Sequence, residues 1–170
     1  MSWLTDFVKP KLRALVGREI PDNLWTKCPS CEQLLFHRDL PGNLYVCRHC
    51  QHHYRLGARE RLKMLMDQGH YDILPIPKPT PDPLKFKDVK KYGDRLKDAR
   101  SKTGEDDAIL VASGSIGSIP VVVAVFDFRF MGGSMGMAVG NGIVAAANGA
   151  IQRKCPLIVI PSSGGARMQE

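Results

Sequence analysis

Residues 121–136 read VVVAVFDFRFMGGSMG, a run of apolar and largely β-branched residues that ends in a glycine-rich turn. This pattern predicts a buried strand leading into a turn. Residues 136–153 are rich in Gly, Ala, Val and Ile and end in Arg153-Lys154. They predict a helix that is apolar on nearly all sides and therefore buried, with a basic pair suited to its C-terminus. A strand, a turn and a buried helix in this order indicate an α/β fold.

The flanking segments extend the pattern. Residues 108–112 form another apolar run before a turn marked by Gly114, Gly117 and Pro120, so two consecutive strands are expected. Residues 157–160, LIVI, predict a short strand, and residues 162–167 predict a glycine-rich turn leading to another helix. Toward the N-terminus we expect helices over residues 58–68 and 88–103. Five alternating prolines in residues 73–83 favour an extended connector between them.

Two cysteine pairs form the most specific motif. Cys28-Pro-Ser-Cys31 and Cys47-Arg-His-Cys50 are separated by 15 residues. Two residues between thiols let one tight turn present both sulfurs, and two such turns make a tetrahedral four-sulfur zinc site. Four protein ligands leave no open position, so the zinc is expected to be structural. The alternatives are iron in the same site, a pair of disulfides and four unrelated thiols.

The residues around this motif have simpler interpretations. Apolar residues at 34–36 and 44–46 predict short strands joined by a turn at residues 41–43. His49, His52 and His53 are expected to be surface residues or neighbours of the metal, because four cysteines already fill its shell. Cys155 stands apart before a proline and is expected to be an inert buried thiol rather than a nucleophile.

The charge of the chain is unevenly distributed. The 170 residues carry 24 Lys and Arg against 17 Asp and Glu, a net charge of +7, and the surplus is concentrated in residues 1–63. A basic region suits nucleic acid or an anionic ligand, although a solvated basic face is an equal alternative. No apolar run reaches the roughly 18 residues of a membrane helix. Asp6 and Lys9 interrupt the apolar start, which argues against a secretory signal.

The glycine-rich segments allow several local interpretations. Residues 130–136 would offer backbone N–H groups near a helix start, a setting that suits an anionic or oxygen ligand. Spacing of Gly132, Gly136 and Gly140 by four residues also permits close helix packing without any ligand. The Gly140-x-Gly142-x-x-Ala145 pattern mimics a dinucleotide fingerprint but lies inside the expected helix. Residues 163–167 could aim N–H groups at one point, as an oxyanion hole does, or form a plain strand-to-helix turn.

Taken together and in this order, four segments resemble the biotin-dependent carboxyltransferases, and most closely their acetyl-CoA carboxylase branch. The segments are Trp25-Thr-Lys-Cys28 with Cys31, Cys47-Arg-His-Cys50, FMGGSMG at residues 130–136 and SGGARMQE at residues 163–170. The resemblance implies a zinc ribbon followed by a crotonase-like spiral of ββα units. The implied reaction moves a carboxyl group from carboxybiotin to acetyl-CoA, giving malonyl-CoA for fatty-acid synthesis.

The resemblance also assigns roles to individual residues. The backbone of Gly165 and Ala166 would supply a catalytic N–H donor, and Arg167 would hold the loop or an anion. The remaining residues expected to bind substrate are Gly132, Gly133, Ser134, Met135 and Gly136. The implied cofactor is one structural zinc per chain, held by Cys28, Cys31, Cys47 and Cys50, and biotin enters only as the carboxyl donor on a separate carrier.

The implied partners are a carboxyltransferase α subunit in an α2β2 assembly, the biotin carboxyl carrier protein and biotin carboxylase. RNA could bind the basic ribbon as a side ligand. The alternative function is that of a zinc-ribbon nucleic-acid-binding protein. A bacterial cytoplasmic location is expected ahead of a plastid one, because no Ser- and Arg-rich leader is seen.

The expected organisation is an N-terminal arm at residues 1–25, a zinc ribbon at 26–56, a helical and proline-rich connector at 57–104 and the first part of a carboxyltransferase domain at 105–170. Members of the family continue past GGARMQE to a second glycine-rich loop that supplies another donor. We therefore expect these 170 residues to be the front part of a longer chain, with an incomplete spiral, and to be inactive alone.

Overall fold

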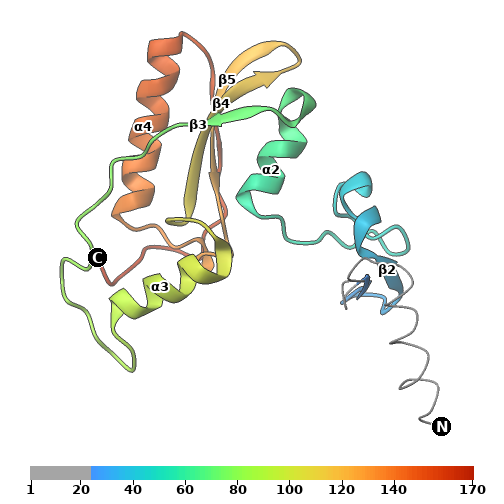
Figure 1. Ribbon diagram of the computed structural model, residues 1–170, viewed down its shortest axis with the longest axis horizontal. Coiled ribbons are helices and arrows are strands. Elements are labelled where there is room, and N and C mark those ends of the chain that lie inside the picture. The colour runs from blue at the N-terminus through green and yellow to red at the C-terminus, as the bar shows by residue number, and fades with distance from the viewer. Residues whose placement is uncertain (1–23) are drawn as a thin grey trace, which may run out of the picture. The chain divides into compact units, whose positions relative to one another are not determined.

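The computed structural model describes residues 24–170, so the expected arm at residues 1–25 lies almost entirely outside the described residues (Figure 1). The chain divides into two compact units, Met1–Arg55 and Leu56–Glu170. Residues 57–104, expected as a connector, contribute helices and a strand to the second unit. No helix in the described part of the chain is long and apolar enough to cross a membrane.

The first unit is a small ribbon. Strand β1 (Trp25–Lys27) pairs antiparallel with β2 (Leu34–Phe36), and two 3-10 turns follow, η1 (His37–Asp39) and η2 (Pro41–Asn43). The prediction of a strand over residues 44–46 is wrong. Leu44 and Tyr45 have φ values of 52° and 58°, and two successive left-handed residues cannot continue an extended strand. They turn the chain back, and only Val46 forms an isolated bridge, to His53.

The second unit is built on a four-stranded sheet in the order β3-β4-β5-β6 (Figure 1). Its strands are β3 (Tyr71–Ile73), β4 (Ile109–Ile116), β5 (Ile119–Phe126) and β6 (Leu157–Ile160). The first two pairings are antiparallel and β5 pairs with β6 in parallel. The helices are α2 (Ala58–Leu65), α3 (Tyr92–Thr103) and α4 (Met137–Arg153), with 3-10 turns η3 (Asp67–Gly69) and η4 (Met131–Gly133). The expected succession of two strands, a helix and a third strand is thus confirmed.

The apolar runs of β4 and β5 are buried on both faces of the sheet. Ile109 and Val111 of β4 belong to one core with side chains of α3 and α4, whereas Leu110 and Ala112 belong to a second core with α2. Side chains alternate across a strand, so a strand covered on both faces needs apolar residues at every position. This requirement explains the unbroken apolar runs in the sequence.

The bounds of α4 match the prediction, but burial on all sides is wrong. The side facing the sheet carries small residues, including Ala146, Ala150 and Gly142, and a Cβ on Gly142 would lie 2.9 Å from the Ile109 side chain. Val144 and Ile151 are 60% and 73% exposed. Small residues let the helix approach the sheet on one side, and the larger apolar side chains lie on the other.

Two further helix predictions need correction. Helix α3 begins at Tyr92 rather than at residue 88, because the preceding residues form a turn in which the Asp88 carboxylate accepts the Lys90 N–H. The segment at residues 162–170 forms bends and turns instead of the expected helix. Here the Arg167 N–H donates to the carbonyl of Met135, so the backbone of this segment is hydrogen-bonded to residue 135 rather than within a helix.

Candidate functional site

The four cysteine sulfurs of the first unit form one cluster, and all lie within 4.8 Å of one another. The Sγ atoms of Cys28 and Cys50 are 3.7 Å apart, and those of Cys31 and Cys47 are 3.8 Å apart. A tetrahedral zinc site with Zn–S bonds of ~2.3 Å has sulfur–sulfur edges of about 3.8 Å. The soft donor set and its spacing therefore fit a structural zinc ion.

The two cysteine turns have the same backbone geometry. The Cys28 carbonyl accepts the N–H of Glu32, and the Cys47 carbonyl accepts the N–H of Gln51, both at 2.9 Å. Glu32 and Gln51, each four residues after the first cysteine of its pair, have φ values of 59° and 63°. Two matching turns thus present their sulfurs to one point, as the C-x2-C spacing predicted.

The cluster favours one thiolate and disfavours a second until a cation is bound. Burial opposes ionisation of Cys28, but backbone N–H groups of Cys31 and Ser30 outweigh it and lower the Cys28 pKa to about 6. The Gln33 N–H favours ionisation of Cys31, but burial and the neighbouring sulfurs raise the Cys31 pKa to about 12. A divalent cation removes this repulsion between thiolates.

In the second unit, the two glycine-rich segments expected to form the active site lie side by side. The Met135 N–H donates to the Gly165 carbonyl at 2.9 Å, and the Arg167 N–H donates to the Met135 carbonyl at 2.9 Å. These bonds form a parallel bridge between Met135 and Ala166. A third bond runs from the Gly164 N–H to the Gly132 carbonyl at 2.9 Å. Residues 132–135 and 164–167 thus form one continuous backbone framework.

Glycine is required at the closest point of this framework. Gly133 has a φ of 65°, and a Cβ there would lie 2.0 Å from the carbonyl oxygen of Ser162. Gly132 also has a positive φ, of 68°, but a Cβ there would meet open space. Gly136 is the N-cap of α4, and the Glu170 carboxylate occupies the space beside it. Of the predicted substrate-binding glycines, Gly133 is therefore the one that lets the two segments meet.

Arg167 lies buried beneath the framework. Its guanidinium forms a two-point ion pair with Asp107, with Nη1–Oδ2 at 3.0 Å and Nη2–Oδ1 at 2.7 Å. It also donates from Nε to Ser134 Oγ at 3.0 Å and from Nη2 to the Ser134 carbonyl at 2.9 Å. Burial lowers and the Asp107 contact raises the Arg167 pKa, and the ion pair prevails. Of the two expected roles of Arg167, holding the loop is the one that these contacts fit.

Tyr92 and Glu170 complete this buried network. The Tyr92 hydroxyl accepts a hydrogen bond from Arg167 Nη1 at 3.2 Å and donates to Glu170 Oε1. The other Glu170 oxygen accepts the Met137 N–H in the first turn of α4. The network thereby links α3, the start of β4 and the start of α4 to residues 134 and 167.

One donor was expected from the backbone of Gly165 and Ala166, and only one of these two N–H groups is without a partner in the described chain. The Gly165 N–H donates to Ser163 Oγ at 3.0 Å. No hydrogen bond within residues 24–170 uses the Ala166 N–H. That N–H shares a planar trans peptide with the Gly165 carbonyl, which points at Met135, so the Ala166 N–H points the opposite way.

Ala166 lines a cleft with a volume of about 660 Å³. Ser134 lies in the same wall, and the cationic side chains of Arg95, Lys102 and Arg129 line the rest with other residues of α3 and the loops. The cleft therefore brings the residue with the unpartnered N–H together with three cationic side chains and one carboxylate, that of Asp98.

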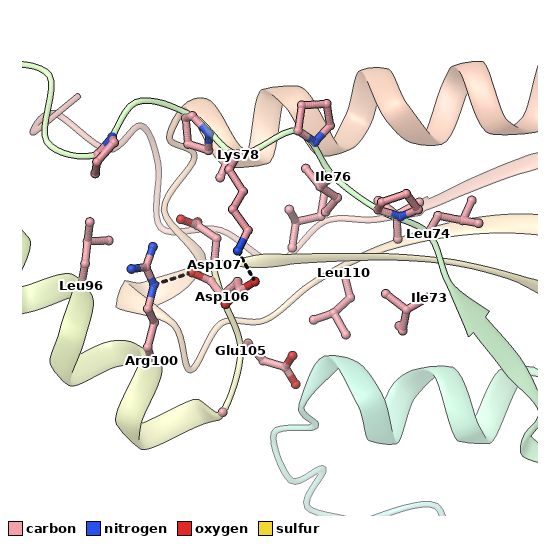
Figure 2. Close-up of a pocket in the computed structure, with 18 of the residues that line it drawn as sticks. Ile73, Leu74, Ile76, Lys78, Leu96, Arg100, Glu105, Asp106, Asp107 and Leu110 are labelled. Atoms are coloured by element: carbon pink, nitrogen blue, oxygen red, sulfur yellow. Dashed lines mark hydrogen bonds and ion pairs between the residues drawn. The ribbon is translucent and has the colours of Figure 1, made fainter.

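Figure 2 shows a second cavity, of about 690 Å³, between the proline-rich segment, α3 and β4. Its main polar side chains are paired with one another. Lys78 reaches Asp106 at 3.8 Å, Arg100 donates to the Asp106 carbonyl at 3.0 Å, and Arg59 pairs with Glu105 at 2.7 Å. Two cations of the Ala166 cleft are paired as well, Arg95 with Asp88 and Arg129 with Asp127. The Ala166 cleft is the better candidate for chemistry because the Ala166 N–H has no acceptor within residues 24–170.

Asp107, Tyr92 and Arg129 were not among the residues singled out from the sequence. Asp107 directly precedes the apolar run at residues 108–112, and an acidic residue at that place is a sequence signal that could have been noticed. Tyr92 has no comparable local pattern, because its partner Arg167 lies 75 residues away. Arg129 pairs with Asp127, only two residues earlier, so this ion pair is local in the sequence.

Comparison with known proteins agrees with these features. Residues 25–50 match the model of the acetyl-CoA carboxylase zinc finger domain, and residues 55–170 match that of the carboxyl transferase domain. The whole chain is 57% identical to the acetyl-coenzyme A carboxylase carboxyl transferase subunit beta of Granulibacter bethesdensis and 52% identical to that of Dinoroseobacter shibae. It covers 56% and 53% of those two proteins, so it spans about half the length of the curated relatives it matches.

A solved structure shares the fold. The transcarboxylase 12S structure with hydrolysed methylmalonyl-coenzyme A bound is 28% identical, with a TM-score of 0.50, over 68% of this chain and 20% of that chain. The carboxyl transferase model covers most of the chain, including both glycine-rich segments, and it follows directly after a zinc ribbon. The chain therefore belongs to the carboxyl transferase family, in its zinc-ribbon-bearing branch.

Proposed function

We propose that the protein to which this chain belongs transfers a carboxyl group from carboxybiotin to acetyl-CoA, forming malonyl-CoA. The named relatives are β subunits of acetyl-coenzyme A carboxylase carboxyl transferase. Family membership supports the reaction class, and the identity of these relatives supports acetyl-CoA as the acceptor. Zinc would stabilise the ribbon and take no part in the reaction, because four sulfurs fill its coordination shell.

The chemical difficulty of this reaction is the weak acidity of the acetyl methyl group. Loss of a methyl proton places negative charge on the thioester oxygen. The methyl carbon then forms a bond to the transferred carboxyl carbon while the carboxyl–nitrogen bond of the donor breaks. The donor nitrogen keeps the electron pair of that bond and takes up the proton lost from the methyl group. A preorganised N–H donor aimed at the thioester oxygen lowers the barrier by about 3–4 kcal/mol.

The proposal depends on one observation, the unpartnered N–H of Ala166. It has no acceptor within residues 24–170, its direction is fixed by the Met135–Gly165 hydrogen bond, and its residue lines the cleft. Its neighbour Gly165 is less suited, because the Gly165 N–H is held by Ser163. We therefore assign the donor role to Ala166 and supporting roles to Gly165 and Arg167.

The other lining residues fit a coenzyme A thioester. Arg95, Lys102 and Arg129 supply cations for anionic groups. Met135, which is not among the lining residues, forms the bridge to Ala166 and is 46% exposed. Gly132, Gly133, Ser134 and Gly136 would shape this wall through their backbone. We propose that these residues contact the acyl group and its pantetheine arm.

The proposal is tested in the reverse direction, with the full-length protein assembled with its α subunit. Malonyl-CoA and biocytin are supplied, and formation of acetyl-CoA is followed. Turnover that requires both substrates supports the proposal. No turnover by subunits shown to be folded and zinc-loaded would refute it.

The partner proteins follow from the same proposal: an α subunit that binds the biotin, its carrier protein, biotin carboxylase and an α2β2 arrangement of the transferase. A bacterial cytoplasmic location stays a prediction. Single-stranded RNA as a side ligand of the ribbon also stays a prediction. It is supported by Trp25, which is 57% exposed and whose ring centroid lies 5.4 Å from that of Phe36, because exposed aromatic rings can stack on bases. Nucleic-acid binding as the main function is disfavoured by the carboxyl transferase domain.

A further inference from the structure

We propose that Asp107 and Tyr92 are positioning residues for the reaction, because they fix Arg167 and, through it, the direction of the Ala166 N–H. This inference rests on the proposed function. Neither side chain lines the cleft that contains Ala166, so each would act on the reaction through Arg167.

Asp107 anchors Arg167 to the sheet. Both Asp107 oxygens accept from the guanidinium, at 2.7 and 3.0 Å, and Oδ1 also accepts the Ala108 N–H at 2.7 Å. A two-point pair between planar groups fixes orientation as well as distance, which a single contact cannot do. Ala108 directly precedes β4 and belongs to the buried core, so the carboxylate is anchored to the start of a buried strand.

Tyr92 fixes Arg167 from the side of α3. Its side chain is fully buried, and its hydroxyl accepts from Arg167 and donates to Glu170. Burial and the Glu170 carboxylate raise the Tyr92 pKa, so the hydroxyl keeps its proton at neutral pH and continues to donate. Glu170 in turn accepts the Met137 N–H of α4, so Tyr92 ties two helices to Arg167.

The position of Arg167 controls the peptide that carries the donor. The Arg167 N–H donates to Met135, and the Gly165 carbonyl accepts from Met135, so Ala166 is held between two anchored peptides. The Arg167 guanidinium also holds Ser134, the residue before Met135, through its side chain and its carbonyl. A change in Arg167 therefore shifts both sides of the bridge and turns the Ala166 N–H away from its target.

The test compares three variants in the full-length protein assembled with its α subunit. Asp107→Asn keeps the shape of the side chain but places an NH2 group against the guanidinium. Tyr92→Phe removes one hydroxyl and keeps the ring. Asp67→Asn is the matched control, because Asp67 accepts hydrogen bonds from Ser115, Gly117 and Ser118 at the β4–β5 turn and does not contact the bridge.

We expect Asp107→Asn to lower kcat at least about tenfold and Tyr92→Phe about three- to tenfold, with the KM for acetyl-CoA changed less than about threefold. A small misplacement of a catalytic group has effects of this size, up to about a hundredfold. Both substitutions act through Arg167, so the double variant should lose less than the product of the two single losses. Asp67→Asn should lower the melting temperature and leave kcat within about twofold.

Two results separate this inference from the function on which it rests. A wild-type assembly that is folded and zinc-loaded but inactive would refute both the proposed function and this inference. An active wild type whose Tyr92→Phe and Asp107→Asn variants match the control, once corrected for the folded fraction, would overturn the inference alone. A rise in KM with unchanged kcat would also overturn it, because that pattern indicates lost substrate binding. If the Asp107→Asn variant fails to fold, the kcat of the Tyr92→Phe variant alone tests the inference.

Discussion

The carbonyl oxygen of Ser162 lies 2.0 Å from the place where a Cβ on Gly133 would stand. The two residues belong to the two glycine-rich segments, so this contact sets how closely the segments approach. Any side chain at residue 133 forces them apart, and the bridge between Met135 and Ala166 lies next to this point.

We therefore expect Gly133→Ala to reduce carboxyl transfer at least tenfold and to destabilise the second unit by about 2–4 kcal/mol, from a strained backbone and a steric clash. Gly132→Ala is the matched control, because Gly132 has a similar φ but open space around it. The Gly132→Ala substitution should lower the free energy of unfolding by only about 1 kcal/mol. Chemical denaturation and the reverse assay measure both effects, and equal losses in the two variants would contradict the role of the Ser162 contact.

Replacing Ala166 tests the donor directly. Ala166→Pro removes the N–H and leaves the N–H groups of Met135 and Arg167 available for the bridge. We expect kcat to fall about 10²–10³-fold, the range found for loss of one oxyanion donor. Ala166→Gly keeps the N–H and should retain most of the activity. If the two variants are equally impaired while both remain folded, the N–H of residue 166 is not the donor.

Removing one sulfur ligand tests the metal site. Cys47→Ser should abolish binding of the one zinc per chain and unfold the ribbon, because its small core is built around the cysteines. Cys155→Ser, which changes the cysteine outside the cluster, should keep one zinc. Elemental analysis of the purified protein provides the measurement. A stoichiometric metal in Cys47→Ser would show that the four sulfurs do not form the site.

Acid stability should depend on Asp127. Burial opposes ionisation of this carboxylate, but Arg129 and the N–H of Ala58, the first residue of α2, outweigh it and lower the Asp127 pKa below its ordinary value of 3.8. A depressed pKa in the folded state contributes stability that is present above pH 3.8 and is lost as the pH falls through the folded-state pKa.

Asp127→Asn should therefore destabilise the second unit at pH 7 by about 1–3 kcal/mol and make its unfolding less sensitive to pH below about 4. Asp98→Asn serves as the control, because Asp98 has a lowered pKa but is half-exposed in its pair with Lys90. An exposed pair contributes little to stability. Urea unfolding between pH 3 and 7 checks both variants, and parallel pH profiles for wild type and Asp127→Asn would count against this role.

Much of the fold could be predicted because its signals are local. The spacing of Cys28, Cys31, Cys47 and Cys50 identified the zinc site, since two tight turns are encoded within a few residues each. The apolar runs at residues 108–112 and 121–126 identified two strands, because covering both faces of a sheet demands such runs. The family resemblance of the glycine-rich segments was likewise carried by short motifs.

Elements whose conformation depends on distant partners were missed. Residues 44–46 have strand-forming side chains, yet the chain must turn there to bring the second cysteine pair to the first. The segment after Gly165 looked like a helix start, but its backbone is hydrogen-bonded to Met135. In both cases a contact outside the local window overrode the local preference.

The sequence by itself determined the four metal ligands, the strand–helix–strand order and the two glycine-rich segments, because covalent spacing and side-chain pattern specify each of them within short stretches. Only the tertiary structure decided which backbone donor is free and what holds it. The Ala166 N–H points away from Met135 only because β6 runs parallel to β5 and returns residue 166 to residue 135. Arg167 is a buried anchor only because the sheet places Asp107 beneath it, 60 residues earlier in the chain.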